Sequence, residues 1–98
     1  MRQTLGAHPV ANYLLTEHAL FEMGRRGITT DRVYELLDSP EQRIDVRPGR
    51  VVLQSRISMG TPRQPYLLRV FVDVDREPPE VVTVYRTSKI SKYWRQEQ

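Results

Sequence analysis

The spacing of apolar residues changes part-way along the chain, from a helical period to the period of a strand. Within the first 40 residues, apolar positions three or four apart predict two helices. Thr16 is placed to cap the first helix, over residues 17–26, and Gly27 supplies its C-terminal stop. Thr29 or Thr30 caps the second helix, and a serine–proline pair ends it. Because only a few residues join them, the two helices should form a hairpin.

Beyond Pro40 the apolar positions alternate, which is typical of half-buried strands. The pattern predicts four strands, over residues 43–47, 51–57, 66–74 and 81–85. Pro48 and Gly49 mark the turn between the first two strands. Residues 1–15 show no strong period, so we expect an irregular N-terminus. Residues 88–98 form a basic tail whose spaced apolar residues suit a short docked helix.

Two helices are too few to cover both faces of a four-stranded sheet. We therefore expect an α+β fold in which two N-terminal helices pack on one face of a four-stranded, mostly antiparallel sheet. Alternation assigns these residues to the face under the helices: Ile44, Val46, Val51, Leu53, Leu68, Val70, Val72, Val82 and Val84. It assigns these to the open face: Arg43, Arg47, Gln54, Arg56, Arg69, Phe71, Thr83 and Tyr85. A slip of one residue in any strand would invert its assignment.

Length and composition exclude several classes of protein. The 98 residues fit a single domain, spanning 1–98, and the absence of cysteine excludes disulfides, thiolate chemistry and cysteine-based zinc sites. No apolar run approaches the roughly 20 residues that span a bilayer, and no signal peptide is recognisable, so we expect a cytoplasmic protein without membrane contact. The two histidines match no metal-binding spacing, and no glycine-rich phosphate loop occurs. We expect neither a metal nor a cofactor.

The charge is unevenly distributed along the chain, although the net charge is only +3. Residues 29–41 carry four acids and one arginine, whereas 43–56 carry four arginines and one aspartate. Residues 81–98 are again basic, with four basic residues and one glutamate. Basic patches of this kind attract phosphate polymers and other anionic partners. A solvated surface rich in arginine is the alternative interpretation.

The predicted open face combines arginine with aromatic residues, which suits single-stranded RNA. Guanidinium groups pair with phosphate oxygens in a two-pronged geometry, and aromatic rings stack on unpaired bases. The candidate RNA-binding residues on this face and in the tail are Arg43, Arg47, Arg56, Phe71, Lys89 and Lys92. Pairing across strands is the alternative role for such residues.

Metal-independent RNA cleavage needs a base, an acid and a cation that holds the phosphate charge. The candidate catalytic residues are His18, Arg69, Tyr85 and Arg86. His18 is the one histidine inside a predicted element and can serve as base or acid. Arg69 and Arg86 would hold phosphate, and Tyr85 would stack on a base or act as a weak acid. The alternatives are that His18 caps or orients its helix or bridges it to the sheet, and that Arg69 forms a cross-strand salt bridge to Asp45 or Asp73.

Three segments of the chain carry a resemblance to a known family. Residues 16–29 read Thr-Glu-His-Ala-Leu-Phe-Glu-Met-Gly-Arg-Arg-Gly-Ile-Thr, residues 38–41 read Asp-Ser-Pro-Glu, and residues 82–87 read Val-Thr-Val-Tyr-Arg-Thr. Their order is similar to that of a bacterial domain-of-unknown-function family, number four-two-five-eight. That family in turn resembles the RelE and BrnT toxins of toxin–antitoxin pairs, which are small basic proteins whose sheet face cuts RNA. The resemblance implies a RelE-like domain with RNA and an acidic antitoxin-like protein as partners.

Two hypotheses about function follow. In the first, the chain is a toxin-like domain that binds RNA on its basic sheet face and cleaves it as a metal-independent endoribonuclease. In the second, the same face belongs to a non-catalytic module that binds an acidic protein or RNA. The limited set of acid and base residues motivates the second hypothesis.

Overall fold

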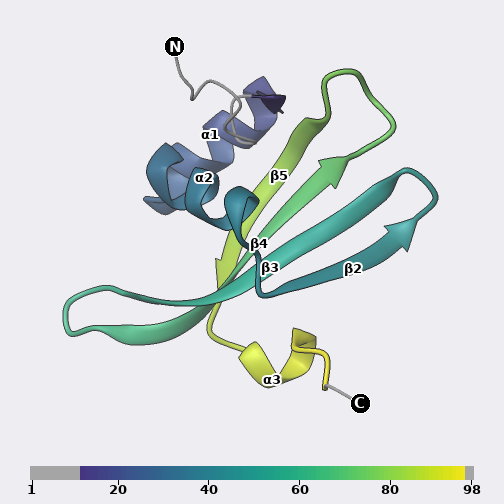
Figure 1. Cartoon of the computed structure of the whole chain (residues 1–98). Helices are drawn as coiled ribbons and strands as arrows, with labels where there is room; N and C mark the ends of the chain where they lie inside the picture. The colour runs from purple at the N-terminus through teal and green to yellow at the C-terminus, as the bar shows by residue number, and fades with distance from the viewer. Residues whose placement is uncertain (1–11, 97–98) are drawn as a thin grey trace, which may run out of the picture.

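The computed structural model describes residues 12–96 as two helices, a sheet and a short C-terminal helix (Figure 1). The elements, in chain order, are β1 (Leu14–Leu15), α1 (Glu17–Arg26), α2 (Thr30–Asp38), β2 (Gln42–Arg47), β3 (Arg50–Met59), β4 (Gln64–Asp73), β5 (Glu80–Thr87) and α3 (Ile90–Tyr93). The strands form one mixed sheet in the order β1-β5-β4-β3-β2. Helices α1 and α2 lie together on one side of this sheet, and α3 lies beyond the end of β5 (Figure 1).

The two N-terminal helices begin and end where the local sequence predicts. Thr16 caps α1, since its Oγ1 accepts a hydrogen bond from the backbone N–H of Ala19 at 3.1 Å. Gly27 ends α1 in the left-handed conformation, with φ of 68°. Thr29, rather than its neighbour Thr30, caps α2 through a bond from the N–H of Arg32 at 3.2 Å. These ends agree with the sequence because capping depends on neighbouring residues alone.

The hydrophobic core lies between the helix pair and one face of the sheet, which we call the helix face. The helices and their connection contribute Ala19, Met23, Ile28, Val33, Leu36 and Leu37. The sheet contributes Val51, Leu53, Leu68, Val70, Val72, Val81 and Val84. Side chains that alternate with these in β3, β4 and β5 form the opposite face, which we call the second face. Its central residues are Gln54, Arg69, Phe71 and Tyr85.

The sheet has five strands rather than the four expected, because a fifth forms from the N-terminal segment. In β1, Leu14 and Leu15 pair parallel to β5, opposite Glu80 and Val81. The N–H of Leu14 donates to the carbonyl of Pro79 at 2.9 Å. The expectation of an irregular N-terminus is therefore wrong at residues 14–15, whereas residues 1–11 lie outside the described chain. Two residues are too few to display a period, so only the distant partner strand reveals this one.

Strand β2 faces the opposite way from the sequence assignment. Arg43 pairs with the core residue Leu53 and shares the helix face, while Ile44 pairs with Val52 on the second face. A register shift between residues 45 and 47 then places Arg47 opposite Arg50, on the second face as expected. The assignment failed because β2 is an edge strand that extends past the helices. Neither side of such a strand is clearly buried, so the alternation of its residues does not show which side faces the core.

Two further residues depart from the assignment of faces. Val46 is 48% exposed and lies at the shift in β2. Val82 is the extra residue at a second register shift, since Thr83 pairs with Phe71 and the adjacent Val72 pairs with Val81. Neither Val46 nor Val82 belongs to the core. Bulges of this kind insert a residue into one strand, and alternation in the sequence carries no mark of them.

Candidate nucleic-acid interface

A row of hydrogen-bonded polar side chains crosses the second face from β2 to β5. Gln42, Gln54, Arg69 and Tyr85 are successive register partners on the four strands. Gln54 Nε2 donates to Gln42 Oε1 at 2.8 Å, and Arg69 Nε donates to Gln54 Oε1 at 2.9 Å. Arg69 Nη1 donates to the Tyr85 hydroxyl at 2.7 Å. Gln54 is fully buried, so its amide depends on these bonds for the partners that water would supply elsewhere.

Arg69 carries a mostly buried charge that aromatic rings, rather than a carboxylate, surround. Its side chain forms no ion pair in the described part of the chain, and the residue is 9% exposed. The guanidinium carbon lies 5.4 Å from the Phe71 ring centroid, 5.8 Å from that of Tyr85 and 4.4 Å from that of Tyr93. Cation–π attraction of this kind strengthens when water is excluded.

The ion pair considered as an alternative for Arg69 is formed by another residue. Asp73, four residues further along β4, pairs with Arg50, whose Nε donates to Asp73 Oδ1 at 2.6 Å and whose Nη2 donates to Oδ2 at 3.0 Å. These charged hydrogen bonds lower the pKa of the Asp73 carboxyl. Asp73 is therefore committed to Arg50, and the positive charge of Arg69 stays uncompensated by any described carboxylate.

Phe71 and Tyr85 present a pair of stacked rings beside Arg69. Their centroids are 6.2 Å apart, and their planes differ by 17°. Both residues are partly exposed, unlike Arg69 below them. The guanidinium of Arg26, at the end of α1, lies 6.0 Å from the Tyr85 ring. Arg26 is itself paired with Glu22 at 2.9 Å, so the second face offers an aromatic surface above the uncompensated charge of Arg69, a combination that suits unpaired bases.

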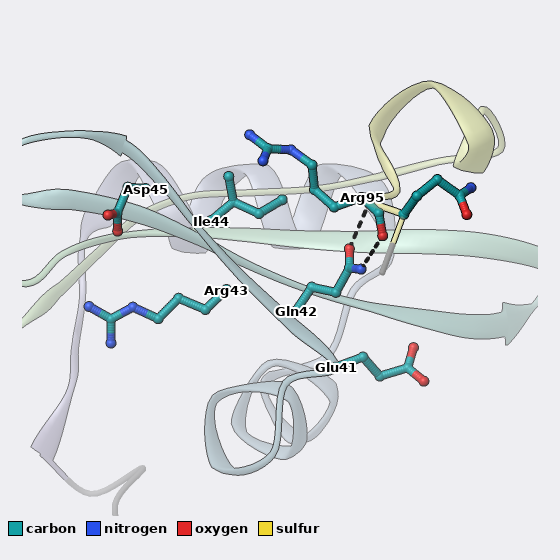
Figure 2. A pocket seen from close by; sticks show the side chains of 7 residues that line it. Glu41, Gln42, Arg43, Ile44, Asp45 and Arg95 are labelled. Atoms are coloured by element: carbon teal, nitrogen blue, oxygen red, sulfur yellow. Dashed lines mark hydrogen bonds between the residues drawn. The ribbon is translucent and has the colours of Figure 1, made fainter. Parts of the chain in front are cut away.

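The C-terminal segment, residues 90–95, covers part of the face that the sequence left open. The side chain of Gln42 forms two hydrogen bonds with the backbone of this segment. Gln42 Nε2 donates to the Arg95 carbonyl at 2.6 Å, and Gln42 Oε1 accepts from the Arg95 N–H at 3.1 Å (Figure 2). Gln54 Nε2 also donates to the Tyr93 carbonyl at 3.1 Å. The expected docked helix is confirmed as α3, but the expectation of a fully open face is wrong. The segment places an aromatic ring over Arg69, which no pattern in the strands indicates.

A polar groove runs along the outer edge of β2, between this strand and the C-terminal segment (Figure 2). Residues 41–45, Arg95 and Gln96 line it. Arg43 therefore lies at the edge of the sheet, and it is exposed. The predicted RNA-binding role of Arg43 would apply to this edge rather than to the second face.

The other predicted RNA-binding residues differ in how free their charges are. Arg56 forms a two-pronged ion pair with Glu41, with Nη2 3.0 Å from Oε2, and also stacks on Trp94 at 4.2 Å. This pairing lowers the pKa of the Glu41 carboxyl and leaves little net charge at Arg56. Lys92 lies over the Tyr93 ring at 5.3 Å, and Lys89 is exposed.

The four predicted catalytic residues do not meet in one place. Arg69 and Tyr85 are register partners on the second face and are hydrogen-bonded. Arg86 instead pairs with Leu68 of the core and therefore lies on the helix face. His18 is exposed on α1. Adjacent residues of a strand point to opposite faces, so the neighbours Tyr85 and Arg86 cannot act on one phosphate from the same surface. A catalytic role for the set stays a prediction.

Two residues of the site lie outside the sequence prediction. Gln42 is the end of the polar row, and Tyr93 supplies the ring over Arg69 and a carbonyl to Gln54. One signal was present, since Gln54 interrupts an apolar run in the middle of a predicted strand. A buried amide needs partners on both sides, which implies polar residues on the neighbouring elements. Which residues these are depends on strand register and on the path of the tail.

The region that matches a known family includes most of the sheet and both N-terminal helices. Residues 15–86 match the family model described as Domain of unknown function (DUF4258). The chain belongs to the DUF4258 family. The match contains Gln54, Arg69 and Tyr85 of this DUF4258 protein, whereas Tyr93 lies outside it. No curated protein and no solved structure matches the chain.

Two other findings concern metal binding and membrane-spanning helices. Within residues 12–96, no cluster of three or more His, Cys, Asp or Glu side chains is arranged to bind a metal ion. The helices in that range are all too short or too polar to span a bilayer.

Proposed function

We propose that this DUF4258 protein binds single-stranded RNA on the second face of its sheet. The observation that carries the proposal is the stacked pair of Phe71 and Tyr85 over the uncompensated charge of Arg69. An unpaired base would stack on the partly exposed rings, which favours RNA whose bases are free. Arg69 lies too deep to grip a phosphate directly, so it acts by holding Tyr85 in place and by giving the surface a positive potential.

Charges at the margin of this surface favour a phosphate backbone over a neutral ligand. Arg47 and Lys92 form no ion pair in the described residues, whereas Arg50 and Arg56 are each paired with a carboxylate. Phosphates that follow the stacked bases would meet these free cations, and binding would weaken as salt rises. The resemblance to the RelE and BrnT toxins, whose sheet face cuts RNA, supports the same surface.

The proposal is for binding rather than for cleavage, because of how the candidate catalytic groups are arranged. A base, an acid and a cation must reach one phosphate together. The second face supplies a cation and a phenol, while His18 and Arg86 are located elsewhere. The toxin-like endoribonuclease therefore needs a base that this arrangement does not provide. An acidic protein is the other candidate ligand, and the experiment below separates it from RNA.

The decisive experiment replaces one of the two phenylalanines in the chain and uses the other as its control. Phe71→Leu keeps an apolar side chain but removes the stacking ring. Because stacking one base contributes roughly 1–3 kcal/mol, we expect the Kd for a labelled single-stranded RNA to rise about 5- to 150-fold. Phe21→Leu changes a ring that is 64% exposed on α1, and it should leave the Kd unchanged. Fluorescence anisotropy at low salt measures both.

Three results would each contradict RNA binding on the second face as the function. If the unaltered protein fails to bind RNA but binds an acidic polypeptide, the module for an acidic partner replaces the RNA proposal. If Phe71→Leu and Phe21→Leu bind RNA equally well, the second face is not the site. If labelled RNA is cut in the presence of a chelator, and Arg69→Met abolishes cutting while binding persists, the toxin-like enzyme is the better description.

A further inference from the structure

Two arginine side chains meet on a single carbonyl oxygen at the far end of the β3–β4 hairpin. Arg32 Nη2, from the first turn of α2, donates to the Ser58 carbonyl at 3.2 Å. Arg63 Nη1, from the hairpin loop, donates to the same oxygen at 2.7 Å. The two nitrogens are therefore at most 5.9 Å apart, because both are hydrogen-bonded to the same oxygen at these distances. Two guanidinium groups thus share one neutral acceptor.

A third guanidinium reaches the same end of the hairpin from β5. Arg86 Nη1 lies 3.9 Å from Met59 Sδ, and Met59 is the residue after Ser58. The Arg86 guanidinium also stacks on the Tyr66 ring at 4.6 Å, which holds the side chain against the helix face. Arg86, placed by the sequence in a catalytic set on the opposite face, therefore belongs to a different cluster.

No carboxylate of the described residues forms an ion pair with this cluster, which we call the hairpin arginines: Arg32, Arg63 and Arg86. The chain has no Asp or Glu at all from residue 46 to residue 72, a stretch that includes the whole hairpin end. Like charges held this close repel one another, and a bound anion would remove the repulsion.

The surface beside these side chains is hollowed. Arg32 and Arg63 line an open hollow of about 550 Å³ together with Met59, Gly60, Thr61 and Pro62. Gly60 allows the loop to turn beside this hollow, because the backbone there has a φ of 97°, which residues other than glycine rarely adopt. The two guanidinium groups thus stand on the wall of a space that admits a small anion.

We infer that Arg32 and Arg63 bind a phosphate group in this hollow, and that Arg86 adds positive potential from its place beside Met59. Guanidinium forks match the tetrahedral oxygens of phosphate, and two of them can grip one phosphate from two sides. The site lies on the helix face, away from Phe71 and Tyr85, so it does not rest on the proposed RNA surface. The phosphate has two sources that this chemistry does not distinguish, a terminal monoester or a diester of a nucleic-acid backbone.

The test is a titration with inorganic phosphate at pH 7 and low ionic strength, followed by NMR of the arginine Nε–Hε groups. In the unaltered protein we expect shifts that saturate, and that chloride at equal ionic strength does not produce. The double variant Arg32→Gln/Arg63→Gln should raise the apparent Kd at least tenfold. Arg76→Gln, which removes an exposed arginine from the β4–β5 loop, is the matched control and should leave the Kd unchanged. Circular dichroism confirms that both variants fold.

The outcomes decide between a site and a merely basic surface. Shifts that grow without saturating, or a double variant that binds phosphate as well as Arg76→Gln does, would overturn the inference. A second titration then compares a 5′-phosphorylated oligonucleotide with its 5′-hydroxyl counterpart. Tighter binding of the first identifies a terminal monoester, and equal binding identifies the backbone diester. Phe71→Leu should not change the phosphate titration, so failure of the RNA proposal is distinguishable from failure of this one.

Discussion

Replacing Arg69 by methionine tests the central claim that a buried guanidinium holds the second face together. Methionine keeps the length and apolar stem of arginine but has no charge and no donor. The change removes the donor to Gln54 Oε1 at 2.9 Å, the bond to the Tyr85 hydroxyl at 2.7 Å and the stacking on Tyr93 at 4.4 Å. The helix face, where the hydrophobic core packs, is untouched.

The expected loss of stability can be worked out from these contacts. Gln54 is fully buried, so an unsatisfied Oε1 costs about 1–3 kcal/mol. Losing the cation–π contact with Tyr93 in a largely dry site costs about 1–2 kcal/mol. Tyr85 is partly exposed, so water can replace the bond that its hydroxyl loses, and this loss adds little. Relief of the buried charge offsets part of the total, which leaves about 2–3 kcal/mol out of a stability on the order of 5–15 kcal/mol.

Urea unfolding, followed by fluorescence and by circular dichroism, measures this loss. The chain has one tryptophan, Trp94, which stacks on Arg56 in the C-terminal segment and so reports on that segment directly. With an m-value on the order of 1–2 kcal/mol/M, Arg69→Met should lower the urea midpoint by about 1–3 M. Arg43→Met is the matched control, because Arg43 is exposed at the sheet edge, and it should change stability by less than about 0.5 kcal/mol.

A double-mutant cycle separates the unsatisfied amide from the other losses. Gln54→Leu removes the buried oxygen that Arg69→Met leaves without a donor, so the double variant should be more stable than the sum of the two single losses by about 1 kcal/mol or more. If the effects add, the amide is not stranded. If Arg69→Met is no less stable than Arg43→Met, the guanidinium does not hold the face, and the argument for its role fails.

Two further predictions concern stability. The Arg50 guanidinium lowers the pKa of Asp73 in the folded state, so the ion pair contributes fully above about pH 4 and is lost as pH falls through the folded pKa. Asp73→Asn should therefore cost about 1–2 kcal/mol in urea unfolding at pH 7 and less at pH 3; a difference that does not change with pH would contradict this. Gly49→Ala should cost about 1–3 kcal/mol, because its φ of 84° is a conformation that residues with a Cβ rarely adopt, and the Asp75 side chain would also have to turn aside. Gly24→Ala on α1, where a Cβ meets no atom within 4 Å, should instead raise the urea midpoint, and equal effects would refute the steric argument.

The sequence predicted those parts of the fold that depend on neighbouring residues. Thr16 and Gly27 mark the ends of α1 because a hydroxyl cap and a left-handed stop act within one turn. The turn at Pro48 and Gly49 and the order of β2 to β5 followed from alternation and from turn residues. The DUF4258 family was also recognisable, from the order of short segments between residues 16 and 87.

The candidate site was predictable only in part. Arg69, Phe71 and Tyr85 were placed together on one face correctly, since β4 and β5 are central enough to have one clearly buried side. Arg43 was placed on the wrong face, because alternation in an edge strand does not say which side is buried. Tyr93 was not placed at all, because the approach of the tail depends on Gln42 and Gln54, which are far from it in sequence.

By itself the sequence determined the helix ends, the strand segments, the excess of arginine and the absence of cysteine. The tertiary structure alone decided that β1 joins the sheet, that the C-terminal segment covers Arg69, and that Arg86 reaches Met59 at the hairpin end rather than the face of Tyr85. The physical reason is the same in each case. Caps and alternation are set by residues a few positions apart, whereas the face that a side chain takes depends on strand register and on which distant segment packs against it.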